Sequence, residues 1–548
     1  MKEVLISLGS NLGDRIYNIK KGLSFLEKKG LKIKKISSFY ITSPMYYEKQ
    51  PYFINAAACI LSPYSACKTL RICLDAEKYL KRKRYVEKGP RTLDMDIIYF
   101  GTEIIKSSFL EIPHPGRLER PFVMIPLNEI NPNFQDPKIK EKICRIVRNL
   151  KNNTIKIPNN PSQTDFFLNS LKPKKADSYG LKDIKDLLKV LNNPQKDIGK
   201  IIHITGSAGK TGTAFFCAQK AHKEYFLKTG LYISPHIISF RERISVNGKK
   251  ISKKDFFDIL IEIISKSPCE LSYFELMTAA AFLYFSRNKT DLAVIEAGLG
   301  GARDATNAVD GDLCVFTPIT KEHADIIGPR LKDIVLEKSG IIKIKSKVIC
   351  SAKNKGKIAF WIKKKSKKTN KDFEIVEEYG KDENIILAKK ALISIFGPPK
   401  IKKSFKYENM PGREEFLIYK GKKILLDGAH IPMSFERLFE KYGFFDTALV
   451  SFLKDKEIKE CMEILNKNCD QIILTEGSSY RTAKAEQILD KIPHIKKIVL
   501  KKNLERAFKK ALKSSSKILI SGSLYFCADI KALIKNKKIS HPKEMIVS

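Results

Sequence analysis

Two aspartates two positions apart, Asp94 and Asp96, open an apolar run that follows a turn at Gly89–Arg91. Successive side chains of a strand point to opposite faces, so both carboxylates lie on one face, about 7 Å apart. Paired oxygen ligands suit Mg²⁺, which is usually held by one or two carboxylates together with substrate phosphates. The alternative is an edge strand with a solvated face, and Asp-x-Asp by itself favours that alternative. The Gly-Pro-Arg turn and the basic run at Lys81–Arg84 favour a metal and phosphate site instead.

A second segment joins an apolar strand pattern, Ile201–Thr205, to a glycine-rich turn and a helix pattern. Backbone N–H groups at such a helix start can surround phosphates, and Lys210 can reach the β and γ oxygens of a nucleotide. A strict Walker spacing requires glycine where this chain has Ile204, so the loop is the shorter Gly-x-x-Gly-Lys-Thr form. The alternative is a structural glycine turn. The loop reads Gly206-Ser207-Ala208-Gly209-Lys210-Thr211.

The pattern of apolar residues predicts the elements that hold these motifs. Residues 1 to about 135 are typical of an α+β domain, and the polar stretch near Asn149–Pro173 favours a linker. From about Ala176, short apolar strands recur between helices, which is typical of a parallel α/β sheet. After a break near Lys400–Pro411, the same alternation predicts a smaller doubly wound domain. We therefore expect a domain over residues 1–150, a linker over 151–175, a central domain over 176–405 and a C-terminal domain over 406–548.

The individual elements follow from the same pattern. In the first domain the expected helices are Asp14–Lys28 and Tyr64–Leu80, and the expected strands are Glu3–Ser7, Ile33–Tyr40, Asn55–Leu61 and Asp94–Phe100. Further along, the expected strands are Ile201–Thr205, Leu292–Glu296, Cys314–Thr317, Lys347–Cys350, Ile424–Leu426, Thr447–Phe452, Gln471–Leu474, Lys497–Leu500 and Lys517–Ser521.

The composition is that of a multidomain globular protein. The chain has 548 residues, too many for a single core. It contains no stretch of about 18 apolar residues and no long apolar segment after Met1, so we expect neither a transmembrane helix nor a signal peptide. Eleven cysteines are dispersed, several of them in apolar runs (Cys59, Cys217, Cys314 and Cys350), which indicates reduced, buried thiols. We expect a cytoplasmic protein without a membrane partner.

The formal net charge of +41 raises a nucleic-acid-binding protein as an alternative. Such a protein is expected to cluster its basic residues among aromatic ones. Here lysine is spread over the whole chain, as in Lys363–Lys365 and Lys402–Lys403, which is typical of a compositional bias acting on solvated faces. We expect no nucleic-acid partner, although the basic field favours anionic substrates.

Six segments of the first domain form an ordered set of motifs: Ser7–Arg15, Ser37–Tyr40, Gln50–Ala57, Gly89–Ile98, Pro113–Pro115 and Arg120–Val123. Through these segments, roughly residues 3–135 resemble the 6-hydroxymethyl-7,8-dihydropterin pyrophosphokinase family. The resemblance implies a ferredoxin-like α+β domain that transfers a pyrophosphoryl group from ATP to the hydroxymethyl oxygen of the pterin and releases AMP.

The resemblance assigns roles to residues of this domain. Asp94 and Asp96 hold two Mg²⁺ ions, because charge on the transferred group must be neutralised. The phosphate donors are Arg82, Arg84 and Arg91, whose alternative is a solvated charge run, and the nucleotide contacts are His114 and Arg120. The pterin contacts are Thr42, Pro44, Phe53, Asn55 and Phe122, of which the two phenylalanines suit a plain core equally well. Relatives often carry an aromatic residue where this chain has Lys88, which leaves one stacking contact open.

The rest of the chain carries a second ordered set of motifs: Ser234–His236, Glu242–Ile244, Asn247–Gly248, Tyr273–Glu275, Thr278, Glu296–Gly301, Asp304–Asn307, His323, Gly328, Glu337–Ile342, Pro411–Arg413, Leu426–His430 and Gly522–Tyr525. Through these motifs, the chain from about residue 176 to 540 resembles the folylpolyglutamate synthase and dihydrofolate synthase group, relatives of the Mur amide ligases. The resemblance implies an α/β Mur-ligase-like central domain with a phosphate loop and a smaller Rossmann-like C-terminal domain. In the implied reaction a substrate carboxylate attacks the γ-phosphate of ATP, and L-glutamate then displaces phosphate from the acyl phosphate.

This second resemblance also assigns roles. The ATP contacts are Gly206, Ala208, Gly209, Lys210, Thr211, Asn384, Arg413 and Asp427, and the dihydropteroate contacts are Ser272, Tyr273, Phe274, Glu275, Arg303, Asp304 and Ala305. Ser234, Glu296 and His323 hold one Mg²⁺ ion. Lys338 matches a lysine that is carbamylated in relatives and then binds a second metal; unmodified, it is a phosphate contact instead. Lys210 and Lys338 are the expected catalytic cations of this half.

Several departures from the family pattern keep alternatives open. Glu322 precedes His323 where relatives usually have aspartate, and Ile431-Pro432 stands where they often have Asn-Pro. The ligase half is therefore either an active enzyme or a module of altered or lost activity. The sequence also leaves open whether dihydropteroate or folates are the preferred substrate. Either way, a functional link to dihydropteroate synthase is implied, since that enzyme joins the two expected steps.

Overall fold

The computed structural model describes residues 1–45, 47, 50–82, 89–152, 154–171, 180–322, 324–367, 372–377, 382–399, 410–454, 457–479, 481–495 and 497–535. The chain divides into two compact units. The first unit comprises Met1–Lys174, Gly180–Asp197 and Ser252–Arg287, and the second is built mainly from Ile198–Ile251 and Asn288–Ser548. The first unit therefore includes a segment taken from the middle of the chain.

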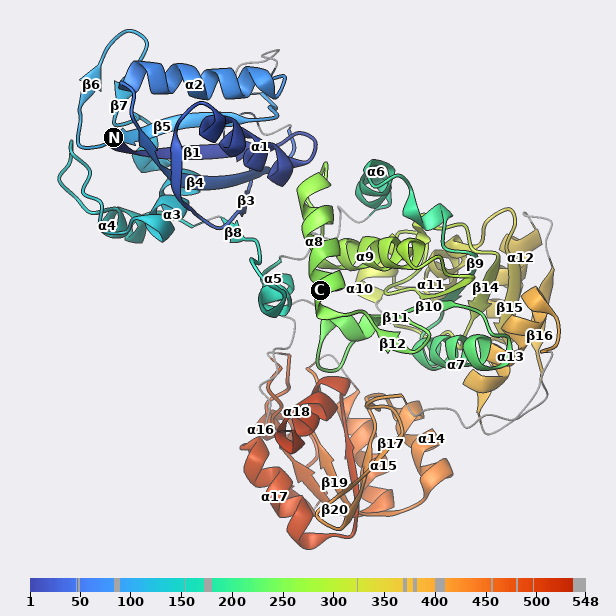
Figure 1. Ribbon diagram of the computed structural model, residues 1–548. Helices are drawn as coiled ribbons and strands as arrows, with labels where there is room; N and C mark the ends of the chain where they lie inside the picture. Colours follow the sequence, from blue (N-terminus) through green and yellow to red (C-terminus); the bar gives the residue numbers. More distant parts are fainter. Residues whose placement is uncertain are drawn as a thin grey trace. The chain divides into compact units, whose positions relative to one another are not determined.

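The first unit contains an antiparallel sheet with the order β5-β1-β4-β3-β8, with β2 also paired to β4. Helices α2 and α3 lie on opposite sides of this sheet in Figure 1. The strands are β1 Lys2–Ser10, β2 Lys32–Ile36, β3 Tyr40–Thr42, β4 Phe53–Ser62, β5 Asp94–Phe100 and β8 Ile155–Lys156, and the separate hairpin is β6 Ile105–Lys106 with β7 Glu111–Ile112. The helices are α1 Arg15–Lys28, α2 Ala66–Tyr79, α3 Pro121–Ile130, α4 Ile143–Arg148, α5 Thr164–Ser170, α6 Lys182–Val190, α8 Lys253–Lys266 and α9 Tyr273–Arg287.

Local sequence explains where the first two helices start. The Asp14 side chain accepts the N–H of Tyr17 and caps α1, and Ser65 accepts the N–H of Lys68 and caps α2. The central strands β1 and β4 are buried along nearly their whole length because helices cover both faces of the sheet. Their register is continuous, so side chains two residues apart share a face.

The larger sheet of the second unit has the order β12-β11-β10-β13-β9-β14-β15-β16. The strands from β10 to β16 in this order run parallel, and β11 and β12 form an antiparallel edge. The strands are β9 Lys200–Thr205, β10 Thr229–Tyr232, β11 Ile244–Val246, β12 Lys249–Lys250, β13 Leu292–Glu296, β14 Leu313–Phe316, β15 Lys347–Ser351 and β16 Phe373–Val376. The helices of this part are α7 Lys210–Glu224, α10 Ala324–Ile327, α11 Leu331–Lys338, α12 Lys357–Lys367 and α13 Glu383–Phe396.

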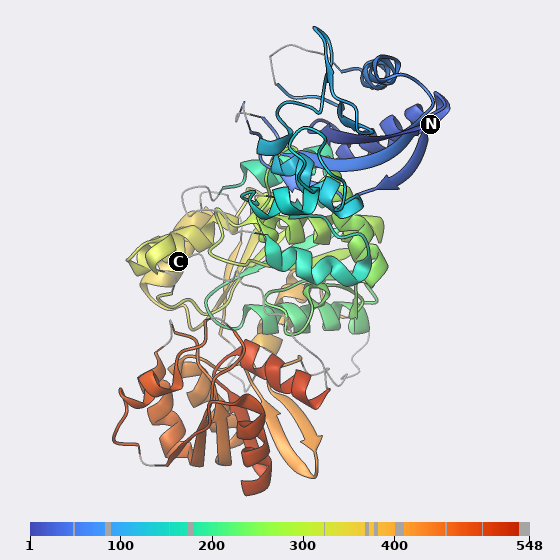
Figure 2. The ribbon, with the colours of Figure 1, turned by 90° about the vertical axis from the view of Figure 1, so that its left-hand side faces the viewer.

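The smaller sheet has the order β17-β18-β22-β19-β20-β21 and is parallel except for β17. Strands β17 and β18 form an edge hairpin, drawn in orange in Figure 2. Alternate residues of the parallel strands belong to two separate cores, because helices cover both faces. The strands are β17 Glu415–Tyr419, β18 Lys422–Leu426, β19 Phe445–Val450, β20 Cys469–Leu474, β21 Ile498–Leu500 and β22 Lys517–Ser521, and the helices are α14 Pro432–Tyr442, α15 Ile458–Asn468, α16 Ala485–Leu489, α17 Leu504–Ser514 and α18 Leu524–Ile534.

The multidomain organisation and the two parallel sheets confirm the coarse fold prediction. Strands β5, β13 and β22 have the predicted bounds, whereas the predicted strand Ile33–Tyr40 is wrong as a single element, because the structure divides it into β2 and β3. The stretch expected to be a linker carries β8 and α5 in its described part. Arg84, Lys88, His323 and the break at 400–409 lie outside the described residues.

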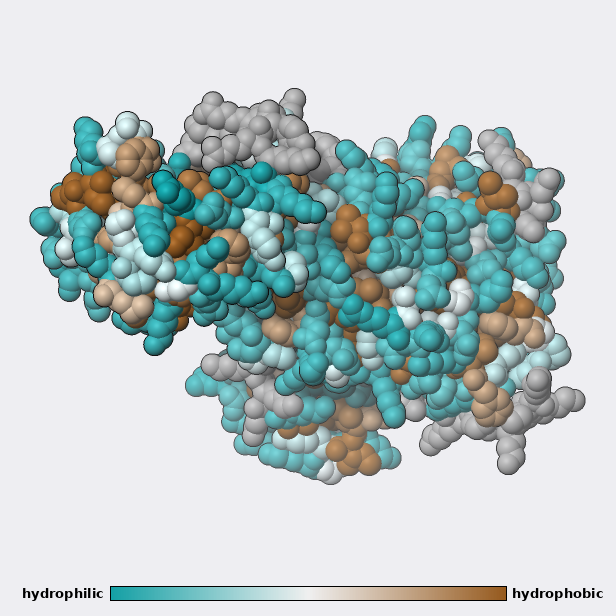
Figure 3. Space-filling view, turned by 45° about the horizontal axis from the view of Figure 1, so that its top comes forward, coloured by the Kyte–Doolittle hydropathy of each residue, from teal (hydrophilic) through white to brown (hydrophobic). Residues whose placement is uncertain are grey.

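The surface in the view of Figure 3 is mostly hydrophilic, with hydrophobic side chains in small separate patches. Among the described residues, no helix is long and apolar enough to cross a membrane. The predicted buried thiols Cys59, Cys217, Cys314 and Cys350 are buried.

Candidate active sites

The predicted carboxylate pair lies on one face of β5. Asp94 pairs with Gly9 of β1 and Asp96 with Ser7, so the spacing predicted from the sequence is present. Both carboxylates are partly accessible to solvent. Desolvation and the neighbouring Asp94 carboxylate raise the pKa of Asp96. A cation or a phosphate-bound metal is therefore favoured beside this pair.

Three arginines surround the aspartates. Arg82 Nη1 lies 2.7 Å from Asp94 Oδ1, and Arg91 Nη1 lies 3.4 Å from Asp94 Oδ2. Arg120 Nη1 lies 3.7 Å from Asp96 Oδ2. The structure thus brings together three of the predicted phosphate and nucleotide contacts with both predicted metal ligands. The planar guanidinium groups suit bidentate binding of phosphate oxygens.

Two residues to which the sequence analysis gave no role hold these arginines in place. Glu77, buried in α2, forms an ion pair with Arg82 and accepts the N–H of Met95 at 2.9 Å. Burial raises the pKa of Glu77, partly offset by Arg82. Asn11 accepts the Arg91 N–H at 2.7 Å through its side chain and fixes the turn before β5. Asn11 lies in a matching segment, whereas nothing in the local sequence distinguishes Glu77 from a surface acid.

The predicted pterin contacts lie next to this arrangement. Asn55 Nδ2 donates to Thr42 Oγ1 at 2.7 Å, which places an amide and a hydroxyl together on adjacent strands. A Cβ atom on Gly9 would lie 2.9 Å from Asn55 Oδ1 and 3.8 Å from Asp94 Cβ, so glycine allows the amide and the carboxylate to approach each other. Pro44 follows β3 in the loop after Thr42.

Both predicted aromatic contacts lie beside arginines. The Arg91 guanidinium carbon is 5.3 Å from the centre of the Phe53 ring, and that of Arg120 is 6.0 Å from the centre of the Phe122 ring. Phe53 is almost fully buried. These rings could stack a flat heterocycle close to groups that bind phosphate.

His114 has the properties of a neutral hydrogen-bond donor. Its Nδ1 accepts the N–H of Gly116 at 3.2 Å. Burial and the nearby Arg120 lower the pKa of His114 to about 4. At neutral pH the ring proton must therefore be on Nε2, from which it can be donated to a nucleotide.

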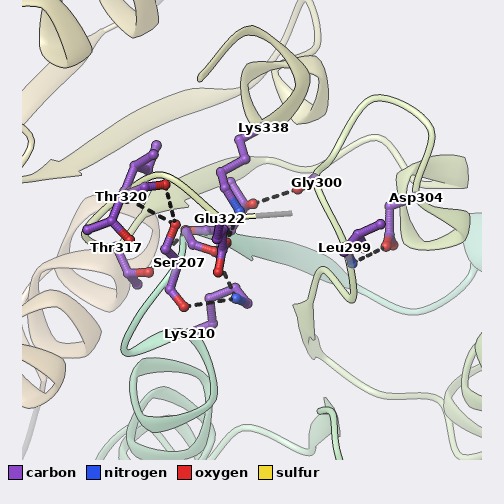
Figure 4. A network of polar contacts seen from close by, with 12 residues as sticks. Ser207, Lys210, Leu299, Gly300, Asp304, Thr317, Thr320, Glu322 and Lys338 are labelled. Carbon is purple, nitrogen blue, oxygen red and sulfur yellow. Dashed lines mark hydrogen bonds and ion pairs between the residues drawn. The ribbon is translucent and has the colours of Figure 1, made fainter. Parts of the chain in front are cut away.

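The second site begins at the carboxyl end of β9. Gly206 and Gly209 have φ values of +152° and +82°, which favour glycine. Lys210, the first residue of α7, donates from Nζ to the carbonyl of Gly206 at 2.8 Å and lies 3.4 Å from that of Ser207 (Figure 4). The N–H groups of Ser207 and Ala208 both point to the Pro318 carbonyl, at 2.8 and 3.2 Å. The predicted strand, turn and helix are all present.

Glu296, at the end of β13, connects three neighbouring segments. It is buried and accepts Thr211 Oγ1 at 2.8 Å and the Ser234 N–H at 2.8 Å. Arg413 Nη2 lies 3.3 Å from Thr211 Oγ1. Burial raises the pKa of Glu296, and the charge of Lys210 opposes this rise. Because β10, β13 and β9 are adjacent and parallel, their carboxyl ends meet here, which is the usual ligand position in such sheets.

Lys338 is buried beside the phosphate loop. Its Nζ donates to the Gly206 carbonyl and to Glu322 Oε1, each at 2.8 Å (Figure 4). Burial lowers the pKa of Lys338 to about 8, against the opposing effect of Glu322. Glu322 is thus a site residue that the sequence singled out only as a departure.

The remaining predicted ATP contacts have defined positions. A Cβ atom on Gly209 would lie 2.6 Å from Asn384 Oδ1, so this asparagine of α13 contacts the loop. Asp427 is partly buried and accepts the N–H groups of Glu414 and Ala429, at 2.9 and 2.8 Å. Burial raises the pKa of Asp427.

The predicted dihydropteroate contacts fall in separate places. In the first unit, Glu275 accepts both the N–H and the hydroxyl of Ser272 at 2.8 Å, next to Tyr273 and Phe274 at the start of α9. In the second unit, Arg303 Nε lies 3.4 Å from Glu337 Oε2. Asp304 accepts the N–H of Leu299 at 2.8 Å and caps the short helix Ala305–Ala308. These hydrogen bonds to neighbouring residues satisfy the Asp304 carboxylate.

The described residues contain no group of three or more His, Cys, Asp or Glu side chains arranged to hold a metal ion. The donor sets nevertheless fit Mg²⁺ of the kind that completes its shell with phosphate and water. Asp94 with Asp96 supplies two carboxylates, and Glu296 with Ser234 supplies one carboxylate beside the phosphate loop.

Two sequence families match the chain, one in each part. The 7,8-dihydro-6-hydroxymethylpterin-pyrophosphokinase family matches residues 5–132, and the Mur ligase middle domain matches residues 204–406. The chain therefore carries a pyrophosphokinase domain of that family and a Mur ligase domain, and it is an enzyme with pyrophosphokinase and ATP-dependent ligase parts.

Several proteins are similar to the larger, ligase part of the chain. A dihydrofolate synthase/folylpolyglutamate synthase of Buchnera aphidicola (Schizaphis graminum) is 28% identical over 408 residues, which cover 67% of this chain and 97% of that protein. The Escherichia coli FolC structure with DHPP and ADP has a TM-score of 0.60 at 21% identity and covers 69% of this chain and 99% of its own. A Yersinia pestis folylpolyglutamate synthase/dihydrofolate synthase with AMPPNP and Mn has a TM-score of 0.61 at 21% identity, over 69% and 99% of the two chains. These two structures show that the fold of this part is FolC-like.

Proposed function

We propose that the chain is a bifunctional folate-biosynthesis enzyme with two ATP-using active sites. One transfers pyrophosphate from ATP to 6-hydroxymethyl-7,8-dihydropterin and releases AMP. The other ligates L-glutamate to dihydropteroate and, by extension, to folates, and releases ADP and phosphate. The observation that carries the proposal is that each family match contains its own phosphate-binding arrangement, one around Asp94 and one around Lys210.

In the first site the protein's own groups orient and neutralise the substrates. Arg82, Arg91 and Arg120 bind the triphosphate, and His114 donates a hydrogen bond to the nucleotide. Mg²⁺ held by the two aspartates supplies Lewis-acid stabilisation of the transferred group.

The same site also has to hold the pterin. Asn55 and Thr42 offer an amide edge, and Phe53 and Phe122 enclose the ring. The pterin hydroxymethyl oxygen then attacks the β-phosphorus of ATP, and AMP leaves.

In the second site, Lys210 and the N–H groups at the start of α7 bind the β- and γ-phosphates. The substrate carboxylate attacks the γ-phosphorus, which gives an acyl phosphate and ADP, and the glutamate amine then displaces phosphate. Glu296 holds Thr211 and Ser234 in place, and Arg413 reaches the same hydroxyl from the C-terminal part. Divalent metal at Glu296 supplies charge neutralisation at the γ-phosphate, and two Mg²⁺ ions per site remain part of this proposal.

Lys338 has two possible roles within this proposal. Its pKa, lowered to about 8 by burial, gives a larger neutral fraction than an ordinary lysine has, and the neutral amine is the form that reacts with CO₂. A carbamate there adds a carboxylate-like metal ligand next to Glu322. Otherwise, Lys338 stays a cation that contacts phosphate.

Several finer predictions also belong to the proposal. We keep the domain bounds 1–150, 151–175, 176–405 and 406–548, the ferredoxin-like description of the first domain and the Rossmann-like description of the last. The strand order β5-β1-β4-β2, with α1 and α2 as crossovers, supports the ferredoxin-like description. Cytoplasmic location and a functional link to dihydropteroate synthase follow from the proposed substrates.

One assay with two nucleotide products tests both activities. The purified chain is incubated with Mg²⁺ and ATP plus hydroxymethyldihydropterin, and separately with L-glutamate plus dihydropteroate or tetrahydrofolate. AMP should form in the first reaction and ADP in the second. No AMP refutes the pyrophosphokinase proposal, and no ADP with either acceptor favours a ligase module that has lost its activity. A salt-sensitive shift of DNA by a chain with neither activity would favour the nucleic-acid alternative.

A further inference from the structure

Arg15 is a buried arginine that neither proposed reaction uses. It is the first residue of α1 and the last residue of the first segment that matches the pyrophosphokinase family. Its exposed fraction is 3%. Arginine is rarely buried to this extent without several hydrogen-bond acceptors.

The acceptors of Arg15 are three backbone carbonyls from two distant segments of the first unit. Nη1 donates to the Tyr52 carbonyl at 2.7 Å, 37 residues away in sequence. Nε donates to the Ser265 carbonyl at 3.1 Å, and Nη2 donates to the Ile264 carbonyl. Ile264 and Ser265 lie in the last turn of α8, about 250 residues further along the chain.

Further hydrogen bonds surround this arginine. Ser265 Oγ accepts the N–H of Ile16 at 2.9 Å and donates to Asp14. The Tyr52 hydroxyl donates to Glu270 Oε2 at 2.7 Å. Together with the bonds of Arg15, these contacts connect the start of α1, the residue before β4 and the end of α8 into one junction.

The physical role of Arg15 follows from helix termini. The last carbonyls of a helix have no intrahelical donors and carry partial negative charge, so a cation near them is stabilising. Burial lowers the pKa of Arg15 to about 10, which leaves it charged at neutral pH. Its planar fork can serve three carbonyls at once, which a lysine ammonium on a single stem matches poorly.

The position of the junction gives it a functional meaning. Tyr52 immediately precedes Phe53 and lies three residues before Asn55, both proposed pterin contacts. On the other side, the end of α8 leads through Glu270 to Ser272–Glu275, which are proposed dihydropteroate contacts. A single buried side chain thus joins the segments before two proposed substrate sites.

We propose that Arg15 is a positioning residue that sets the pterin-binding segment of the pyrophosphokinase site against the C-terminal end of α8. This inference rests on the proposed function. The geometry of Phe53 and Asn55 then depends on a helix that is encoded within the ligase part of the sequence. Loss of the Arg15 side chain leaves three buried carbonyls without this donor and loosens both segments.

The test compares full-length variants by hydrogen exchange and by steady-state kinetics. Arg15→Ala should raise amide exchange in peptides covering residues 50–56 and 264–271. It should raise the KM for hydroxymethyldihydropterin about tenfold with kcat nearly unchanged, because a lost charged hydrogen bond is worth about 1.4 kcal/mol or more. Arg15→Lys should give an intermediate effect, which a general loss of folding would not produce.

Two conservative tyrosine variants complete the test. Tyr52→Phe removes the hydroxyl that binds Glu270 and should raise exchange near residues 268–272, even if Arg15→Ala does not fold. Tyr17→Phe is the matched control, because Tyr17 is an exposed tyrosine of α1, the helix that begins with Arg15. It should change neither amide exchange nor the KM for hydroxymethyldihydropterin.

The outcomes separate this inference from the proposed function. An active wild type whose Arg15 and Tyr52 variants keep wild-type exchange, or whose folded Arg15→Ala variant keeps the wild-type KM, overturns the inference alone. A wild-type chain that forms no AMP overturns the proposed pyrophosphokinase function as well.

Discussion

Asp94 is the central side chain of the proposed pyrophosphokinase site. It faces Arg82 and Arg91 and lies next to Asp96, so its charge serves both cations and metal. Asp94→Asn keeps the size of the side chain and removes the charge. AMP formation should fall about 10²- to 10³-fold, as when a group that stabilises transition-state charge is removed.

The ligase activity of the same preparation is an internal control for this substitution. ADP release with dihydropteroate and glutamate should stay at the wild-type level. Asp75→Asn, at a partly exposed acid of α2, is the matched charge control and should leave both products unchanged. Near-normal AMP formation by Asp94→Asn would refute the proposed metal role.

Lys338 permits a test that distinguishes its two proposed roles. Burial lowers the pKa of Lys338 to about 8, so its neutral fraction grows as pH rises through this value. If the neutral amine takes up CO₂, removing bicarbonate and dissolved CO₂ should lower ADP release, and adding bicarbonate should restore it. The effect should be easiest to see near pH 8, with AMP formation unaffected. ADP release that is insensitive to CO₂ would show that Lys338 acts as an unmodified cation.

At the level of elements, α7 and α13 hold the phosphate loop together. A Cβ atom on Gly212 of α7 would lie 2.4 Å from Asn384 Nδ2. Asn384 belongs to α13, and its side chain also contacts Gly209. Gly212→Ala favours the helix by about 1 kcal/mol in propensity but displaces Asn384. The KM for ATP in the ligase reaction should rise about tenfold, the equivalent of one lost hydrogen bond.

Thermal stability separates this effect from unfolding. The melting temperature of Gly212→Ala should not fall, because the helix gains propensity, and AMP formation should not change. Gly180→Ala serves as the control, because a Cβ atom on Gly180 would have no neighbouring atom within 4 Å. An unchanged KM for ATP would mean that Asn384 does not contribute to nucleotide binding.

Local patterns predict the elements whose partners are close in sequence. The strand Asp94–Phe100 is predicted with its observed bounds, and a helix is predicted after the glycine turn, where α7 begins. The division between β2 and β3 is not predictable, because it depends on distant groups. Ser37 Oγ accepts the N–H of Ala57, and Ser38 Oγ donates to Glu129 of α3, so side chains replace a continuous ladder there.

The same reasoning applies to the sites. Family resemblance places most side chains of both sites, since matching segments carry them. The resemblance assigns no role to Glu77 or Glu322. These residues belong to the candidate sites through ion pairs with Arg82 and Lys338, which no local sequence pattern shows.

At the scale of the whole molecule, the first compact unit is built from separate stretches of the chain. The sequence predicts domains as consecutive stretches of chain, and these bounds stay a prediction. The first compact unit also takes in Ser252–Arg287 from the middle of the ligase match. The reason is a set of contacts between residues about 250 positions apart, such as those of Arg15 with the end of α8. Sequence periodicity carries no information on such pairs.

This interleaving predicts how the chain behaves when it is divided at the expected linker. Expressed alone, a fragment of residues 176–548 lacks Arg15 and Tyr52, so the last carbonyls of α8 and the Glu270 carboxylate lose their partners. Amide exchange in α8 and α9 should then be faster than in the full chain, and the melting temperature should be about 2–4 °C lower, the shift expected for roughly 1 kcal/mol in a domain of this size. Exchange in β9 and α7 is the internal control, because the contacts of these elements with β10, β13 and β14 lie within the fragment. Equal exchange of α8 and α9 in fragment and full chain would contradict the interleaved first unit and favour two independent domains joined by a linker.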